Sequence, residues 1–264
     1  RTFVLTGGNY RAGDLCRELT DWGMDTVRIT VGERLSYSDE AITRGTAGEL
    51  AGWAFDSLAV VLAENDHPIC RQYTAPGIPD DAFQRGKVPM TKEEVRSLCI
   101  SKLRLEEHHT LWDVGAGTGS VSIEGCCAVP KGRVYAVERK PEAVALLEEN
   151  KTKFGLTNLH IVEGMAPEAL ADLPAPDRVF LGGTSGNMEA ILCLALEKNP
   201  EVRVVVTAVT LETIGEAVRC FDALGFADAD IVQIAATRTR KAGRYHLMDA
   251  QNPVWILSGE ACHE

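Results

Sequence analysis

The stretch DVGAGTGS, residues 113–120, constrains the fold of this chain more than any other feature. An apolar, strand-like run precedes it at 110–114, and a helical pattern follows at 119–128. Glycines at alternate positions let the backbone approach a ligand closely, and the first turn of a helix offers free N–H groups. A strand, a glycine-rich turn and a helix in this order are typical of α/β proteins that bind a ligand at the turn.

Strand and helix patterns alternate through the chain after residue 90, which predicts a mostly parallel sheet with helices on both faces. The last two strands have no helix between them, and we expect them to pair as an antiparallel hairpin. Thr91 and Glu94 have the spacing of a capping box at the start of the first of these helices. The expected strands span 110–114, 133–137, 159–163, 178–181, 202–208, 229–235 and 253–258, and the expected helices span 90–103, 119–128, 141–154, 187–198 and 211–224.

The beginning of the chain predicts a second, smaller α/β unit. Strand patterns at 2–6, 26–33 and 58–65, with a helix at 14–22, resemble a βαβ unit, and the polar run 32–46 reads as turns. Residues 67–81 hold three prolines and no periodicity, as linkers do. We therefore predict a small unit at 1–70, a linker at 71–76 and the large unit at 77–264. Because strand-like residues follow Arg1 at once, we expect the natural chain to start earlier.

The spacing of the glycines separates the candidate ligands of the loop. A dinucleotide fingerprint needs glycine at the position of Ser120. Asp113 ends a buried strand, where a carboxylate is costly unless a cation compensates it. S-adenosylmethionine carries an ammonium and a sulfonium, whereas a pyrophosphate would repel the acid. Glu138, at the end of the next strand, can accept the hydroxyls of a ribose in either ligand. We predict that the loop binds S-adenosylmethionine, and the alternative is an NAD-dependent dehydrogenase whose loop binds NAD. The loop residues are Gly115, Ala116, Gly117, Thr118 and Gly119.

Charge and composition exclude other classes of protein. The net charge of −11 disfavours a nucleic-acid partner, which needs a broad basic face. No apolar run reaches the roughly 18 residues of a membrane span, and no secretory signal is visible. The eight cysteines form no C-x-x-C pair, and the six histidines lack metal-ligand spacing. We predict a cytoplasmic protein without a metal, a membrane or a nucleic-acid partner.

Several motifs are similar to those of one enzyme family. DVGAGTGS together with AVERKPEA (136–143) resembles the class I S-adenosylmethionine-dependent methyltransferases, whose fold is Rossmann-like. GIPDDAFQRGKVPMTKEEVRSL (77–98), EGMAPEAL (163–170), FLGGTSGNMEAIL (180–192) and AQNPVWILSG (250–259) resemble the decarboxylating precorrin, or cobalt-precorrin, C15-methyltransferases of cobalamin biosynthesis. The resemblance implies methylation of a tetrapyrrole at C15 with loss of the ring C acetate as carbon dioxide. A class I methyltransferase for another small molecule is the alternative.

The resemblance also assigns the cofactor contacts. They fall on Thr91, the loop Gly115 to Gly119, Glu138 and Ala166. The family often has Asp where Met165 stands here. A methionine cannot accept a hydrogen bond from the adenine amino group as a carboxylate does, so we expect backbone groups of Met165 and Ala166 to act instead.

Substrate contacts are predicted from the carboxylates of a tetrapyrrole, which call for cations with bidentate reach. The alternative for a charge run is a solvated hairpin tip. Gly182 and Gly183 end a strand and would let a flat macrocycle approach the backbone, unless they serve only as a turn. Methyl transfer needs alignment more than a strong base, so we name no catalytic residue. The cationic candidates are Arg238, Arg240, Lys241, Arg244 and His246, with Arg85 and Lys87 as a second group.

The smaller unit carries a resemblance of its own. LTGGN, VGERLSYSDEAITRGT and FDSLAVVLAEN are similar to the C-terminal half of the C5-methyltransferase of the same pathway. The other half of that domain is absent, so the resemblance implies one active site and no C5 methylation. A cofactor-binding subunit without activity is a further alternative. The family also implies a homo-oligomer, up to a tetramer.

Overall fold

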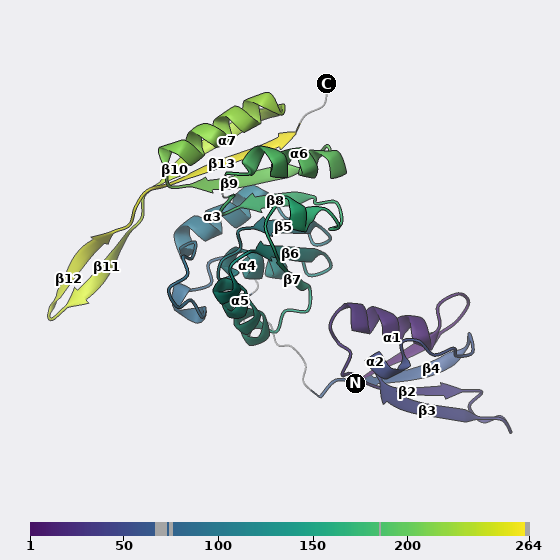
Figure 1. Cartoon of the computed structure of the whole chain (residues 1–264). Coiled ribbons are helices and arrows are strands. Elements are labelled where there is room, and N and C mark those ends of the chain that lie inside the picture. The colour runs from purple at the N-terminus through teal and green to yellow at the C-terminus, as the bar shows by residue number, and fades with distance from the viewer. Residues whose placement is uncertain (67–72, 74–75, 185, 262–264) are drawn as a thin grey trace. The chain divides into compact units, whose positions relative to one another are not determined.

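The computed structural model describes residues 1–66, 73, 76–184 and 186–261. The chain divides into two compact units, Arg1–Cys70 and Arg71–Glu264, which are described one at a time (Figure 1). Most of the linker predicted at 71–76 lies outside the described residues.

The first unit is a four-stranded antiparallel sheet in the order β1-β4-β2-β3. Because β4 runs antiparallel to both β1 and β2, those two strands are parallel to each other, and α1 connects them as a split βαβ unit. Strand β3 occupies the end of the run predicted as turns, so that prediction is wrong there, and the short α2 follows the run directly. The elements are β1 (Thr2–Thr6), α1 (Ala12–Asp21), β2 (Arg28–Glu33), β3 (Ala41–Thr46), α2 (Ala47–Leu50) and β4 (Ala59–Glu64).

The two faces of this small sheet differ. Helices α1 and α2 cover one face, where Ile29, Val31 and Val61 are buried. Phe3 and Leu5 of β1 and Ile42 of β3 are exposed. They alternate with the inward-facing residues of their strands, so they belong to the opposite face.

The second unit contains a seven-stranded sheet in the order β10-β13-β9-β8-β5-β6-β7. Strands β5 to β9 are parallel, and β13 pairs antiparallel with both β9 and β10. The predicted alternation and the terminal antiparallel pair are confirmed. The elements are α3 (Glu93–Leu103), β5 (Thr110–Val114), α4 (Ser120–Ala128), β6 (Arg133–Glu138), α5 (Pro141–Phe154), β7 (Leu159–Glu163), β8 (Arg178–Leu181), α6 (Met188–Lys198), β9 (Arg203–Ala208), α7 (Leu211–Ala223), β10 (Phe226–Ile234) and β13 (Val254–Ala261).

Apolar residues form a core on each face of this sheet. Trp112 and Val114 pack with residues of α6 and α7, whereas Leu111 of the same strand packs with residues of α3 and α4. Figure 1 shows α6 and α7 on one side of the sheet and α3, α4 and α5 on the other. Trp112 is fully buried and Trp255 packs against the same cluster, as predicted for core residues.

A two-stranded ribbon extends from the sheet between β10 and β13 (Figure 1). It consists of β11 (Thr237–Ala242) and β12 (Tyr245–Ala250), paired from Thr237–Ala250 to Ala242–Tyr245. We expected only a long connection here, because charged and polar residues fill β11 and conceal the alternation that marks a half-buried strand.

Helix α3 begins later than expected, and Thr91 does not cap it. The N-cap is Lys92, whose side chain makes no capping hydrogen bond. The N–H of Glu93 donates instead to Oδ1 of Asp80, at 3.0 Å. The capping-box prediction is wrong, because an acid from the preceding segment takes the place of the Thr91 hydroxyl.

Candidate active site

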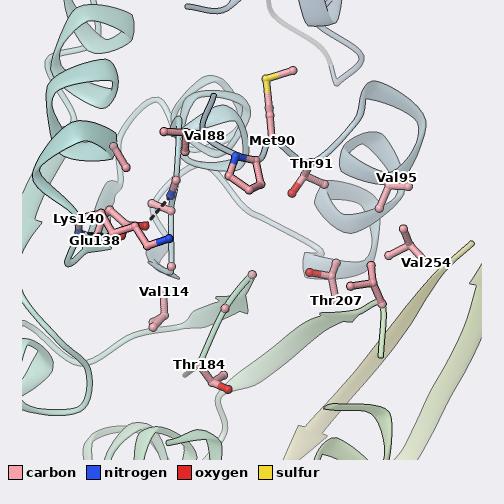
Figure 2. A pocket seen from close by; sticks show the side chains of 18 of the residues that line it. Val88, Met90, Thr91, Val95, Val114, Glu138, Lys140, Thr184, Thr207 and Val254 are labelled. Atoms are coloured by element: carbon pink, nitrogen blue, oxygen red, sulfur yellow. Dashed lines mark hydrogen bonds between the residues drawn. The ribbon is translucent and has the colours of Figure 1, made fainter. Parts of the chain in front are cut away.

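A cavity of about 540 Å³ opens at the carboxyl ends of β5, β6, β8 and β9. The sheet order reverses at β5, since β6 lies on one side of it and β8 on the other. Open parallel sheets bind ligands at such a switch point. In the view of Figure 2, Glu138 and Lys140 lie on one side of the cavity, and Thr207 and Val254 lie on the opposite side.

The three glycines of the loop are each required for a different contact. All have positive φ, of 75° at Gly115, 57° at Gly117 and 77° at Gly119. A Cβ atom on Gly115 would lie 2.6 Å from the carbonyl oxygen of Gly183. One on Gly117 would lie 3.1 Å from the carbonyl oxygen of Pro89, and one on Gly119 would collide with Leu147. The loop is therefore pressed between neighbouring segments on both sides.

Glu138 lines the cavity at the end of β6 and is held by the backbone around it. Its Oε2 accepts a hydrogen bond from the N–H of Gly117 at 3.0 Å. Its Oε1 accepts from the N–H groups of Arg139 and Lys140, at 2.9 and 3.0 Å. Because a carboxylate offers about four acceptor sites, Oε2 retains capacity for a hydroxyl in the cavity.

Comparison with known proteins assigns the family of this chain. Residues 81–260 match the model of the precorrin methyltransferase domain. The chain is 45% identical over 192 residues to the probable cobalt-precorrin-6B C(15)-methyltransferase (decarboxylating) of Pyrobaculum calidifontis, covering 72% of this chain and 98% of that protein. The chain belongs to the precorrin methyltransferase family.

Two further relatives agree with this assignment. The cobalt-precorrin-6B C(15)-methyltransferase (decarboxylating) of Salmonella typhimurium is 39% identical, covering 68% of this chain and 93% of that protein. The crystal structure of precorrin-6Y C5,15-methyltransferase from Geobacter metallireducens superposes with a TM-score of 0.68 at 39% identity, covering 72% of this chain and 99% of that one. The predicted family, fold class and enzyme class are confirmed, and a dehydrogenase is excluded.

The cavity of this precorrin methyltransferase unites most of the predicted binding residues and adds others. From the loop it contains Gly115, Ala116 and Gly117, and from other segments Thr91, Glu138, Met165, Ala166, Gly182 and Gly183. It also contains polar residues that we did not predict individually. Lys140 and the pair Gln251 and Asn252 lie in motifs already quoted for the resemblance, so a closer reading of those motifs could have found them. The polar additions are Lys92, Arg139, Lys140, Thr184, Thr207, Gln251 and Asn252.

Three residues of the predicted cofactor site do not line the cavity. Thr118 and Gly119 turn away from it as the chain enters α4. Asp113 is 1% exposed, and its Oδ2 accepts a hydrogen bond from the hydroxyl of Ser122 on α4. The direct ligand contact predicted for Asp113 is wrong, because the alternation of side chains along β5 directs Val114 to the cavity side and Asp113 to the helix side.

Burial raises the pKa of Asp113 to about 7, with a smaller contribution from the negative charge of Glu138. The unfolded chain keeps the ordinary value of 3.8, so the folded state binds more protons between pH 4 and 7. The contribution of Asp113 to stability must then fall as pH rises through this window. We expect Asp113→Asn to remove this loss, so that its advantage in unfolding free energy over the wild type grows from pH 5 to pH 8. Denaturant titrations at several pH values measure it, and a constant difference would contradict the assignment.

The basic residues of the ribbon do not line the cavity. Arg238 is already engaged by carboxylates, with Nε 2.7 Å from Oε1 of Glu94 and Nη1 3.4 Å from Oδ2 of Asp80. Arg238 is therefore paired with carboxylates in this structure, and its role in binding the substrate stays a prediction. The remaining candidates are exposed on the ribbon, and their role stays a prediction: Arg240, Lys241, Arg244 and His246. Arg85 and Lys87 also lie outside the cavity lining.

A buried arginine organises the wall formed by the segment before α3. Arg96 is fully buried, and its Nε donates to Oε1 of Glu124 at 2.6 Å. Its Nη1 donates to the carbonyl of Thr91 at 2.6 Å and to Asp80, and its Nη2 donates to the carbonyl of Ile78. One guanidinium thus fixes both ends of the segment that leads into the cavity at Thr91.

Two kinds of feature are absent from the described residues. Within them, no helix is long and apolar enough to cross a membrane. The same part of the chain holds no group of three or more His, Cys, Asp or Glu side chains arranged to bind a metal.

Proposed function

We propose that this chain transfers a methyl group from S-adenosyl-L-methionine to C15 of a precorrin and releases the ring C acetate as carbon dioxide, in cobalamin biosynthesis. The relatives named as decarboxylating C(15)-methyltransferases are matched over nearly their whole length, which supports this reaction. The observation that carries the proposal is the shared cavity of the glycine loop and Glu138 at the switch point of the sheet.

The methyl donor occupies the end of the cavity next to Glu138. The free acceptor capacity of Oε2 suits a ribose hydroxyl, and the glycines admit the rest of the ligand close to the backbone. Met165 lines this end and is 45% exposed, so its thioether can pack on a purine ring. The carbonyl of Ala166 accepts a hydrogen bond from Asn187 at 2.9 Å, which fixes the backbone beside Met165.

The tetrapyrrole occupies the opposite end of the cavity. Val254 and Ile234 offer apolar surface there, and Gln251 and Asn252 offer amide groups. A macrocycle presents an apolar plane with polar substituents at its edge, and this lining matches both. Lys92 supplies a cation at the wall, 3.8 Å from Oδ2 of Asp80 and partly exposed.

The residues act by alignment and by excluding water. In the transfer, a carbon–carbon bond forms at C15 as the sulfur–methyl bond breaks, so donor and acceptor must be held in line. The bond between the acetate methylene carbon and its carboxylate then breaks, and carbon dioxide leaves. The electron pair of that bond passes into the conjugated ring, and a proton finally adds to the methylene carbon. The loop, the segment 88–92 and the turn at Gly182 surround the reacting groups and limit hydrolysis and side reactions.

Incubation with a C5-methylated precorrin and S-adenosyl-L-methionine tests the reaction. We expect the product mass to gain one methyl group and lose one carbon dioxide. A methyl gain without carbon dioxide loss would overturn the decarboxylation, and an unchanged mass would overturn the proposed function as a whole. The cobalt-containing substrate should be assayed in parallel, because both forms present the same C15 carbon.

Replacing Glu138 with alanine tests the cofactor end. We expect binding of S-adenosyl-L-methionine to weaken by about 1–3 kcal/mol, because the ribose loses a buried acceptor. Glu163 provides the matched control, since it ends the neighbouring strand β7 opposite Glu138 but is exposed and outside the cavity lining. Calorimetry on Glu138→Ala and Glu163→Ala should show a loss only for the first, and equal affinities would refute the ribose contact.

The smaller unit and the assembly complete the proposal. We infer that Arg1–Cys70 belongs to a C5-methyltransferase domain, and that the chain works in the cytoplasm as a homo-oligomer of up to four copies. Tyr245, Leu247 and Met248 are exposed apolar residues on the ribbon, which supports an association surface there. Analytical ultracentrifugation measures the assembly, and a monomer at micromolar concentration would contradict it.

A further inference from the structure

A segment without regular structure of its own closes one side of the cavity. We call residues 83–92 the cap segment. Val88, Pro89, Met90, Thr91 and Lys92 line the cavity, and Figure 2 labels Val88, Met90 and Thr91 among its walls. The segment also lies directly against the glycine loop, as the 3.1 Å approach of the Pro89 carbonyl to a Cβ on Gly117 shows. Its position depends on side chains from other elements.

Asn150 of α5 joins the cap segment to the glycine loop. It is fully buried and does not line the cavity. Its Oδ1 accepts a hydrogen bond from the N–H of Gln84 at 2.8 Å, and its Nδ2 donates to the carbonyl of Gln84 at 2.8 Å. The same Nδ2 donates to the carbonyl of Thr118 in the loop at 3.0 Å. The side-chain amide of Asn150 therefore pairs with both the N–H and the carbonyl of Gln84, as the backbone of a neighbouring strand would.

We propose that Asn150 is a positioning residue of the cofactor site, which clasps the cap segment and the glycine loop in the spacing that the ligand needs. The inference rests on the proposed binding of S-adenosyl-L-methionine. Thr118 follows the cavity-lining Gly117, and Gln84 leads into the lining residues Val88–Lys92, so the clasp lies between the two walls. Without it, the two backbone segments lose their common anchor, and the carbonyls of Gln84 and Thr118 lose a donor.

Asn158 provides a matched control within the same fold. It is also fully buried, and its Nδ2 also donates to two backbone carbonyls, those of Cys126 at 3.1 Å and Val129 at 2.9 Å. These contacts lie at the end of α4, and the carbonyl of Asn158 accepts from Val134 at the start of β6. The start of a parallel strand lies at the end of the sheet opposite the cavity. Replacing Asn158 should therefore lower stability without altering the site.

The experiment compares Asn150→Ala with Asn158→Ala in the full chain. We expect similar falls in melting temperature, but only Asn150→Ala should raise the Kd for S-adenosyl-L-methionine, by about tenfold or more. Without any ligand, only Asn150→Ala should speed hydrogen exchange of backbone amides in the cap segment. If Asn150→Ala does not fold, Asn150→Asp keeps the shape and removes both donors, and it should show the same two effects.

The outcomes separate this inference from the proposed function. Equal Kd values for both alanine variants, or equal increases, would overturn the positioning role. Unchanged exchange of the cap segment would overturn the clasp itself. If the wild type does not bind S-adenosyl-L-methionine, the proposed function fails, whereas the exchange experiment still decides whether Asn150 holds the cap segment.

Discussion

Replacing Arg96 with alanine should destabilise the larger unit by about 3–5 kcal/mol. The guanidinium is fully buried between Glu124 and Asp80, and it also binds two backbone carbonyls. Removal of one partner from a buried ion pair leaves an uncompensated charge, which costs more than the pair contributes. Urea unfolding followed by tryptophan fluorescence measures the loss, since the buried Trp112 reports on unfolding of the larger unit.

Arg238 offers a matched control for this experiment. It also contacts Asp80, together with Glu93 and Glu94, but its side chain is 38% exposed. Solvent screens such pairs, so Arg238→Ala should cost about 1 kcal/mol or less. Replacing Glu124 as well, in Arg96→Met with Glu124→Gln, should restore part of the stability because one unpaired charge is then removed. If the two arginine variants lose equal stability, the buried network is not the organising element of the wall.

Replacing Gly115 with alanine should weaken binding of S-adenosyl-L-methionine by on the order of 10²-fold while the chain stays folded. The new Cβ would lie 2.6 and 2.8 Å from the backbone oxygen and nitrogen of Gly183. Backbone atoms cannot move aside as the tip of a side chain can, so the loop and the turn at Gly183 must separate. Both segments line the cavity, and a displacement of about 1 Å in such a site costs on the order of 10²-fold.

Gly225 separates the effect of the collision from that of backbone conformation. Its φ is 74°, close to the 75° of Gly115, but a Cβ there meets nothing within 4 Å. Gly225→Ala should therefore show the cost of a left-handed alanine, about 1 kcal/mol, with normal cofactor affinity. Calorimetry and thermal unfolding of both variants give the comparison. If Gly115→Ala binds S-adenosyl-L-methionine with normal affinity, the added Cβ does not displace the loop, and the prediction is wrong.

Local patterns predicted the parts of the site that depend on local geometry. The glycine loop, Glu138 and the strand ends follow from spacing along the chain, because a strand that enters a glycine turn and a helix fixes its own backbone. The alternation of side chains along β5 points Asp113 away from the cavity. The attraction expected between its carboxylate and a cationic ligand led to the wrong prediction that the two are in contact. The orientation of a single strand depends on which face each helix covers, and the sequence alone does not show that.

The clasp and the buried arginine could not be predicted in this way. Asn150 contacts Gln84 across 66 positions, and Arg96 contacts Glu124 across 28. Asn150 lies outside the quoted motifs, and the motif that contains Arg96 does not indicate its partners; a lone asparagine or arginine in a helix is usually a solvated side chain. Similarly, the ion pairs of Arg238 could not be predicted, because its carboxylate partners Glu94 and Asp80 lie far from it in sequence.

The place of β13 in the sheet has a consequence for synthesis. This strand leaves the ribosome after all the others, yet it lies between β9 and β10 in the finished sheet. Until it arrives, β9 and β10 present unpaired edges, and β10 has no neighbour in the sheet to hold it. Exposed strand edges are sites of aggregation in nascent chains. The sheet of the larger unit can therefore be completed only after β13 has been synthesised and has left the ribosome. Chaperones that protect strand edges would act on the chain before that point.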